Sequence, residues 1–248
     1  MFENVIKFIA QEKYLKHNQD TLPIPAKLNI PEWFKKLEHT HENATVKGCM
    51  PFLDTLSSGY LLKMPVDYVI EHNIEVDGEK KTGFATNMDF IDDGIANNIN
   101  INYKEVPQFH NITQLKDSPL IEKNKNLGFH KILNPFIIKT PPGYSTLFLP
   151  PLNNTDDRFS IIPGIVDTDT FTHEVNFPFV VNGDKYPILK TVIKRGTPYV
   201  QVIPFKRQSW KMKIESQSID ERKEIFLFKR KYSIHNYKQM FWSKKTWK

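Results

Sequence analysis

The residues best suited to chemistry are four aspartates in two short runs. Asp167 and Asp169 lie in the stretch Val166-Asp-Thr-Asp-Thr170, and Asp156 and Asp157 precede it. Carboxylate oxygens bind hard divalent cations and orient water, so this cluster could hold one metal ion beside an attacking water. A turn is the other interpretation, because short polar side chains between strands often bond their own backbone. The sequence leaves both interpretations open.

A second group of candidate metal ligands is the pair His39 and His41, which Glu42 follows. The spacing His-x-His-Glu suits a metal site of the cupin type only if a third histidine approaches. The candidates for that third ligand are His110, His130 and His173. Two histidines after a short helix are more often a solvated connection. The metal ligands, and the role of this pair, therefore stay undefined by the sequence.

Other catalytic signatures are missing. Cys49 is the one cysteine, which excludes an internal disulfide and the small disulfide-rich secreted class, and we expect its thiol to be buried. The sequence contains no glycine-rich phosphate loop and no Gly-x-Ser-x-Gly motif. These absences argue against kinases, dehydrogenases and α/β-hydrolases.

Basic residues gather at the C-terminal end of the chain. Residues 206–248 hold thirteen Lys or Arg against four Asp or Glu, a balance of +9, whereas the whole chain carries +6. Lys and Arg pair with phosphates, and aromatic rings stack on bases. The candidate nucleic-acid contacts are Lys229, Arg230, Lys231, Trp242 and Trp247. The alternative is a solvated helix face with docked aromatic side chains.

The elements that must position these residues are mostly strands. Seventeen prolines against ten glycines, with eighteen phenylalanines, favour a strand-and-turn protein over a helical bundle. Runs of alternating or β-branched residues between turn signals mark the expected strands. They cover residues 45–50, 60–70, 74–76, 82–85, 136–139, 144–149, 159–166, 174–181, 186–193, 199–205 and 210–214. The Asp77-Gly78 pair predicts a hairpin, and residues 87–134 are expected to be loops with short strands.

Helices are expected at both ends. Phe2, Val5, Ile6 and Ile9 recur at helical spacing, and a second piece covers residues 31–37. Near the C-terminus, Ser218-Ile-Asp-Glu221 forms a capping box that opens a helix to about Met240. The expected organisation is a helical arm at 1–44, a β region at 45–133, a β core at 134–215, and a basic helix and tail at 216–248.

Three motifs in the β core resemble the dUTPase and dCTP-deaminase superfamily. They are Pro141-Pro-Gly-Tyr144, Pro163-Gly-Ile-Val-Asp-Thr-Asp169 and Ile193-Lys-Arg-Gly-Thr-Pro-Tyr-Val-Gln-Val202. The resemblance implies a dUTPase-like β-barrel core. With the elements named above, the expected fold is mainly β, with this core, an additional N-terminal β region, an N-terminal helical arm and a C-terminal basic helix. The whole chain, including Gly48-Cys-Met-Pro-Phe-Leu-Asp54 and Ser57-Ser-Gly-Tyr60, also resembles an uncharacterised family of tailed-phage proteins.

The resemblance gives individual residues expected roles. Asp167 takes the place of the catalytic aspartate, which orients water toward the α-phosphorus of a nucleotide. The expected ligand-binding residues are Asp169, Phe171, Gly196 and Gln201. The sequence departs from the family at several points. Pro151-Leu-Asn-Asn154 lacks the cation and hydroxyl that hold phosphate, and the glycine-rich C-terminal arm is absent. The tyrosine that packs under the deoxyribose is replaced by Thr170, or by Phe171 with a one-residue shift, and the glutamate base and His-Thr pair of the deaminases are not found.

Two functions follow from these features. The first is a non-catalytic phage protein that uses the β scaffold for binding or assembly; the second is a diverged hydrolase of a nucleoside triphosphate, which would need Mg²⁺. The expected partners are further copies of the chain, a homotrimer if the resemblance extends that far, and nucleic acid bound weakly by the tail. We expect no membrane partner, no secretion by a signal peptide, and a place in the host cytoplasm or the virion.

Overall fold

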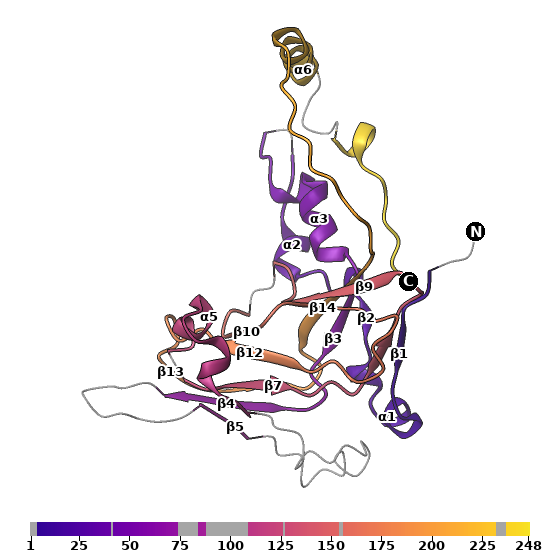
Figure 1. Ribbon diagram of the computed structural model, residues 1–248. Helices are drawn as coiled ribbons and strands as arrows, with labels where there is room; N and C mark the ends of the chain where they lie inside the picture. The colour runs from indigo at the N-terminus through magenta and orange to yellow at the C-terminus, as the bar shows by residue number, and fades with distance from the viewer. Residues whose placement is uncertain are drawn as a thin grey trace. The chain divides into compact units, whose positions relative to one another are not determined.

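The computed structural model (Figure 1) describes residues 4–40, 42–73, 84–87, 109–125, 127–153, 156–231 and 237–248. The chain divides into two compact units. We call Met1–Ile24 with Gly59–Lys206 the β unit, and Pro25–Ser58 with Arg207–Lys248 the helical unit. These units differ from the four consecutive segments expected from the sequence, because each is assembled from two stretches that are far apart in the chain.

The described elements are mostly short strands. The strands are β1 (Lys7–Ile9), β2 (Ile24–Pro25), β3 (Tyr60–Lys63), β4 (Tyr68–Asn73), β5 (Phe84–Asn87), β6 (Phe109–His110), β7 (Phe129–Ile132), β8 (Ile137–Lys139), β9 (Tyr144–Leu149), β10 (Phe159–Ile161), β11 (Gly164–Val166), β12 (Phe177–Val181), β13 (Ile188–Ile193) and β14 (Pro198–Lys206). The α-helices are α1 (Glu12–His17), α2 (Glu32–Lys36), α3 (Met50–Ser57), α5 (Pro119–Lys123) and α6 (Ile219–Lys231). Single turns of 3₁₀-helix cover Gln19–Thr21, Ala26–Asn29, Val46–Gly48 and Ile112–Leu115, and a π-helical turn covers Tyr237–Phe241.

The strands form four sheets with antiparallel pairing. Their orders are β1-β8, β10-β12-β7-β6, β11-β9-β14-β3-β2 and β13-β4-β5. The mainly β fold predicted from the sequence is therefore confirmed. The expected closed barrel is not found among the described residues, because each sheet there ends in two edge strands.

Proline explains where the predicted strands differ from the observed ones. The run predicted as one strand at 159–166 is two strands, β10 and β11, which lie in different sheets on either side of Pro163. The run at 60–70 is likewise divided into β3 and β4, with Pro65 between them. A proline lacks the N–H that a continuous ladder needs. The strands at 144–149 and 199–205 match β9 and β14 closely.

At two places the local sequence pattern predicted the wrong type of secondary structure. Residues 7–9, predicted to be helical, form β1 and pair with β8, so a distant strand overrides local spacing. Residues 45–50, predicted as a strand, contain a 3₁₀ turn and the start of α3, whose first turn holds Pro51. Cys49 precedes α3 and is exposed, so the expectation of a buried thiol is wrong. The predicted Asp77-Gly78 turn lies outside the described residues, although the flanking β4 and β5 pair antiparallel.

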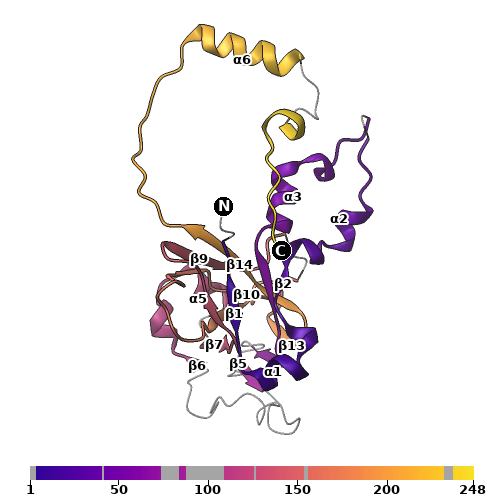
Figure 2. The same ribbon diagram turned by 90° about the vertical axis from the view of Figure 1, so that its right-hand side faces the viewer.

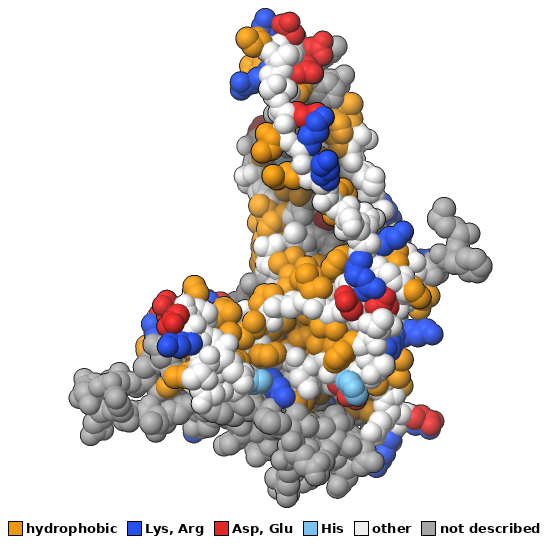
Figure 3. Space-filling view, viewed as in Figure 1, with side chains coloured by type: hydrophobic (Ala, Val, Ile, Leu, Met, Phe, Trp, Pro, Cys, Tyr) orange, Lys and Arg blue, Asp and Glu red, His pale blue; other side chains and the backbone are white. Residues whose placement is uncertain are grey.

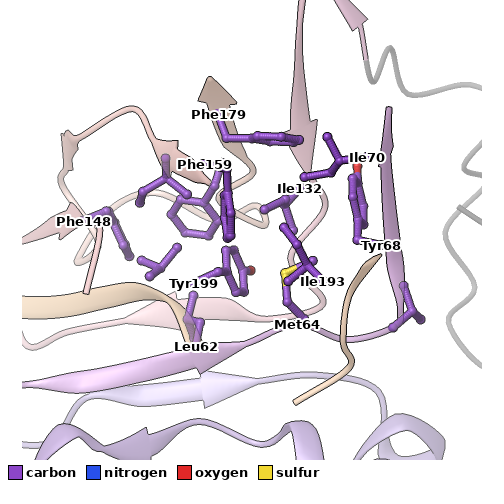
Figure 4. Close-up of a cluster of buried hydrophobic side chains, with 14 of the residues drawn as sticks. Leu62, Met64, Tyr68, Ile70, Ile132, Phe148, Phe159, Phe179, Ile193 and Tyr199 are labelled. Carbon is purple, nitrogen blue, oxygen red and sulfur yellow. The ribbon is translucent and has the colours of Figure 1, made fainter. Parts of the chain in front are cut away.

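The core of the β unit gathers large side chains from most of its sheets. Figure 4 shows Phe159, Phe179 and Tyr199 packed together with aliphatic side chains such as Ile132 and Ile193. β12 is buried on both faces, since Val180 packs instead on a second cluster with Ile121 of α5. Fully burying one such side chain stabilises the fold by about 1.5–3 kcal/mol, so this cluster is the main stabilising feature of the unit.

β14 is the central strand of the five-stranded sheet, and it pairs with β3 on one side and β9 on the other. Gly59 lies just before β3 with a φ of +69°. A Cβ atom at this position would lie 2.1 Å from the carbonyl oxygen of Val202 in β14. The close approach of these two backbone segments therefore requires glycine.

Arg195, in the turn between β13 and β14, joins three parts of the β unit. Its guanidinium donates to both carboxylate oxygens of Asp20 at 2.6 and 2.7 Å and to Asn18 Oδ1 at 2.9 Å. Its backbone N–H donates to Asp67 at 2.8 Å, and Lys194 Nζ donates to the same carboxylate at 2.7 Å. These bonds hold the pKa of Asp20 below its usual value through Arg195, and that of Asp67 through Lys194 and the Arg195 N–H.

The helical unit has its own aromatic cluster. The rings of Phe34 in α2 and Phe52 in α3 stack at 5.8 Å, and Trp33 meets both edge-on. The C-terminal segment also contacts α3, because Trp242 Nε1 and Lys245 Nζ both donate to the carboxylate of Asp54. Within the described part of the chain, no helix is long and apolar enough to cross a membrane.

Three Gly→Ala substitutions test the approach of Gly59 to β14. Gly164→Ala should be almost neutral, since a Cβ there meets open space at an ordinary φ. Gly143→Ala, with φ +83° and open space, should cost about 1–2 kcal/mol for its backbone conformation alone. Gly59→Ala adds a backbone clash and should cost at least about 3 kcal/mol. Urea unfolding followed by far-UV circular dichroism measures the three values, and equal costs for Gly59 and Gly143 would contradict this account.

The Arg195 bonds predict loss of stability in acid. The folded-state pKa of Asp20 and of Asp67 lies below the unfolded value, so their contribution is present above about pH 4 and is lost as pH falls through the folded pKa. We expect the urea midpoint of wild type to fall between about pH 5 and pH 3, and Arg195→Gln to lower the midpoint at neutral pH and flatten this fall. Lys16→Gln, which removes an exposed pair with Glu12, is the control and should change neither.

Candidate functional site

The turn after β11 brings Asp167, Asp169 and Phe171 together. β11 pairs with β9, so the turn follows directly from the register of Val166 with Thr146. The carbonyl oxygen of Asp167 accepts the N–H groups of Thr170 at 3.1 Å and Phe171 at 2.9 Å, which closes the turn. Asp167 and Phe171 are exposed and Asp169 is half-buried.

The carboxylates of this turn bond to the neighbouring hairpin. Asp167 Oδ1 accepts a hydrogen bond from Ser145 Oγ at 2.6 Å. Asp169 Oδ2 accepts the backbone N–H of Gly143 at 2.8 Å, in the turn between β8 and β9. Both carboxylates therefore help to fix one turn against another, as the turn interpretation of the sequence predicts.

Beneath the turn lies a buried cluster of hydroxyl groups. Thr168 is fully buried, and its Oγ1 lies 2.7 Å from both Thr140 Oγ1 and Thr146 Oγ1. Its carbonyl oxygen also accepts the Thr140 N–H at 3.3 Å. A buried hydroxyl network with its bonds satisfied fixes one arrangement of its surroundings. The cluster thus positions the carboxylates on either side of Thr168, a role that sequence reasoning did not assign.

Gln201 and Gly196 lie elsewhere in the β unit. Gln201 is buried in β14, and its Oε1 accepts the N–H of Leu152, which orders the loop after β9. Gln201 pairs with Leu149 at one end of β9, whereas Asp167 bonds to Ser145 near the other end. At about 3.3 Å per residue, these two points are about 13 Å apart along β9. Gly196, with φ +81°, is farther still, in the turn before β14.

The loop after β9 lines a cavity of about 240 Å³. This is the loop that begins at Pro151, where the resemblance expected phosphate-holding residues. The lining combines apolar side chains, among them those of Phe159 and Ile161 in β10, with polar ones, including Ser160 of the same strand. The lining residues are Lys123, Pro150, Pro151, Asn153, Asp156, Asp157, Phe159, Ser160, Ile161, Pro198 and Tyr199.

The two aspartates of this cavity bond to cations. Arg158 donates to both oxygens of Asp156, at 2.9 Å from Nε and 2.7 Å from Nη2, and lowers the pKa of that carboxyl. Lys185 Nζ and the Tyr186 hydroxyl each lie 2.6 Å from Asp157 and lower its pKa as well. Neither carboxyl belongs to the Asp167 turn, so the four aspartates of the sequence pattern form two separate groups. Sequence reasoning missed Lys123 and Arg158, since neither stands in a motif.

The described histidines do not gather into a metal site with other described side chains. Among the described residues no group of three or more His, Cys, Asp or Glu side chains could hold a metal ion. His39 belongs to the helical unit, where its Nδ1 accepts the Thr45 N–H at 2.9 Å, and His41 lies outside the described residues. His110 stacks on Phe129 in the β unit, and its Nδ1 lies 2.7 Å from Gln114.

In the basic tail, Trp242 and Trp247 are half-buried, and Trp242 contacts Asp54 through its indole N–H. Trp242 also lies under the Lys245 ammonium, at 5.8 Å from the ring centre. The backbones of Lys229, Arg230 and Lys231 lie in the last turn of α6, and their side chains are outside the described set. The capping box at the start of α6 is confirmed, with Ser218 N–H donating to Glu221 at 2.8 Å and Glu221 N–H donating to Ser218 Oγ at 3.2 Å.

Compared with known proteins, the sequence matches no protein-family model and no curated protein. The dUTPase-like and phage resemblances therefore remain expectations from the motifs themselves.

Substitutions in the turn separate its buried and exposed bonds. Thr168→Val removes the hydroxyl shared by Thr140 and Thr146 and should cost about 1–3 kcal/mol. Asp167→Asn keeps an oxygen that can accept the Ser145 bond and should cost under about 1 kcal/mol. Thr170→Val, at an exposed position of the same turn, is the control and should be close to neutral. Unfolding free energies in urea measure all three, and a neutral Thr168→Val would contradict the role given to the cluster.

Proposed function

We propose that this protein is a phage protein that uses its β unit as a scaffold for binding or assembly, without catalysis. The observation that carries the proposal is the engagement of the candidate catalytic groups in structural bonds. Asp167 and Asp169 bond to the β8–β9 hairpin, and Gln201 bonds to the loop after β9. These groups also lie at different places along the sheet, whereas phosphoryl transfer needs cations and a metal gathered around the phosphates.

The binding function belongs to the C-terminal segment. Residues 207–248 carry twelve Lys or Arg against four Asp or Glu. Basic side chains lie beside apolar ones on this segment, as the upper part of Figure 3 illustrates. This combination suits a phosphate backbone with unstacked bases, so weak binding to single-stranded nucleic acid is the activity we assign to it.

A diverged nucleotide hydrolase is the second candidate. It is favoured by one observation, the presence of Asp167 and Asp169 on the same turn with Asp167 exposed. In that case both carboxylates would hold Mg²⁺ and orient water.

A charge-reversal variant tests the proposed nucleic-acid contact. Lys229→Glu/Arg230→Glu/Lys231→Glu should weaken binding of a labelled single-stranded oligonucleotide at least tenfold, measured by fluorescence anisotropy. Wild-type affinity should fall by about 10–100-fold between about 50 and 200 mM salt, as expected for a few phosphate contacts. The matched control, Lys7→Glu/Lys116→Glu/Lys190→Glu, changes the net charge equally on the β unit and should bind nearly as wild type.

Two results would contradict the proposal. Equal loss of binding in both triple variants would mean that net charge alone, and not the tail, attracts the oligonucleotide. Turnover of a nucleoside triphosphate with Mg²⁺ that disappears in Asp167→Asn would favour the hydrolase.

A further inference from the structure

Lys123 brings a positive charge to the cavity beside the loop after β9. It is the last residue of α5, it is half-buried, and it lines the cavity. Among the described residues, its ammonium makes no hydrogen bond or ion pair. Taking an ammonium partly out of water is unfavourable unless an anion or a hydrogen-bond acceptor replaces the lost hydration. A bound anion would supply the partner that Lys123 lacks in this part of the chain.

The backbone at Lys123 is held against β12, beside which α5 lies (Figure 1). The N–H of Gly183 donates to the carbonyl oxygen of Lys123 at 3.0 Å. The next residue, Asn124, is buried; its Oδ1 accepts the Val181 N–H at 2.8 Å and its Nδ2 donates to the Leu127 carbonyl at 2.9 Å. A site whose backbone is fixed before binding loses less conformational entropy when a ligand binds. Lys123 therefore extends from a preorganised position.

The other charges at the cavity are paired with one another. Arg158 donates two hydrogen bonds to Asp156, and Lys185 donates one to Asp157. Together with Lys123, three cations stand against two carboxylates, which leaves +1 in this described group. A ligand with one negative charge brings the group to neutrality, whereas a polyphosphate would place several negative charges near the two aspartates. Charge therefore favours a monoanion.

The remaining lining sets the size and shape of the ligand. Phe159 and Tyr199 are buried aromatic residues, Pro150 adds a further apolar ring, and Asn153 and Ser160 are neutral polar residues. Such rings offer flat apolar faces against which a ring of the ligand can pack. The volume of about 240 Å³ equals that of about eight waters at about 30 Å³ each, so the ligand has roughly ten non-hydrogen atoms.

We propose that this cavity binds a small monocarboxylate that carries an apolar ring. A carboxylic acid, with a pKa of about 4, is a monoanion at neutral pH. The Lys123 ammonium donates a charge-assisted hydrogen bond to the carboxylate, and the ring packs on the apolar lining. The site lies within the β unit and includes no residue of the C-terminal segment, so it is separate from the proposed nucleic-acid contact.

Three small molecules test the charge and the ring of the ligand on the full-length protein. Benzoate has both, benzamide has the same shape without the charge, and acetate has the charge without the ring. Benzoate should shift a limited set of amide-proton NMR signals saturably, with a Kd of about 1 mM or lower. Benzamide and acetate should each bind at least about tenfold more weakly at the same ionic strength.

A variant of Lys123 tests its role in the same titration. Lys123→Gln removes the charge at nearly the same length and should weaken benzoate binding by about tenfold or more. The matched control is Lys116→Gln, which removes the same charge from an exposed position of the β unit and should bind as wild type. Neither change removes a backbone hydrogen bond, and the amide-proton spectrum of each variant shows that it is folded.

Several results would overturn the proposal. They are the absence of saturable benzoate shifts in wild type, equal affinity for benzoate and either benzamide or acetate, and unchanged affinity in Lys123→Gln. Equal weakening in both variants would mean that net charge alone attracts the anion. Tighter binding of inorganic tripolyphosphate than of benzoate would also overturn it, because the two aspartates should then not disfavour a polyanion. Oligonucleotide binding is measured separately and depends on none of these results.

Discussion

The burial of β14 between β3 and β9 is the constraint on which the rest of the β unit depends. Val200 and Val202 are fully buried in the core. Both strands that pair with β14 come much earlier in the sequence. Its position brings the carbonyl of Val202 against Gly59 and the amide of Gln201 against the loop after β9. Its first residues follow the turn that holds Arg195, and its last residue leads into the coil before α6.

Local signals in the sequence were sufficient where an element is defined by its own residues. β9 and β14 have alternating side chains between clear turns, and Ser218 and Glu221 cap α6 as predicted. Prediction failed where pairing with a segment distant in the sequence determines the secondary structure. Residues 7–9 have helical spacing, yet their pairing with β8, more than a hundred residues away, makes them a strand. The sequence shows Pro163, but it does not show that this proline separates two strands of different sheets.

The candidate site shows the same division. The stretch from Val166 to Thr170 was recognisable as a turn, because short polar residues follow a strand. The hydroxyl cluster beneath this turn could not be recognised from the sequence. Thr140, Thr146 and Thr168 stand in no motif, and only the fold brings their side chains together. The cavity beside Pro151 depends on Lys123 and Tyr199, which only the fold brings together. At residues 210–214 the alternation of apolar and charged side chains predicted a strand, and this prediction was wrong, because the structure has irregular coil between β14 and α6 (Figure 2).

The bonds of Arg195 have a consequence for the order of folding. Its partners Asp67, Asp20 and Asn18 are 128, 175 and 177 residues away in the sequence, so the chain must close very long loops before these bonds form. Contacts of this kind form late and slow unfolding more than they speed folding. During synthesis the N-terminal segment leaves the ribosome well before Arg195 exists. Strand β1 pairs with β8, which lies more than a hundred residues later in the sequence. The N-terminal segment therefore cannot reach its native contacts until β8 and then Arg195 have been synthesised.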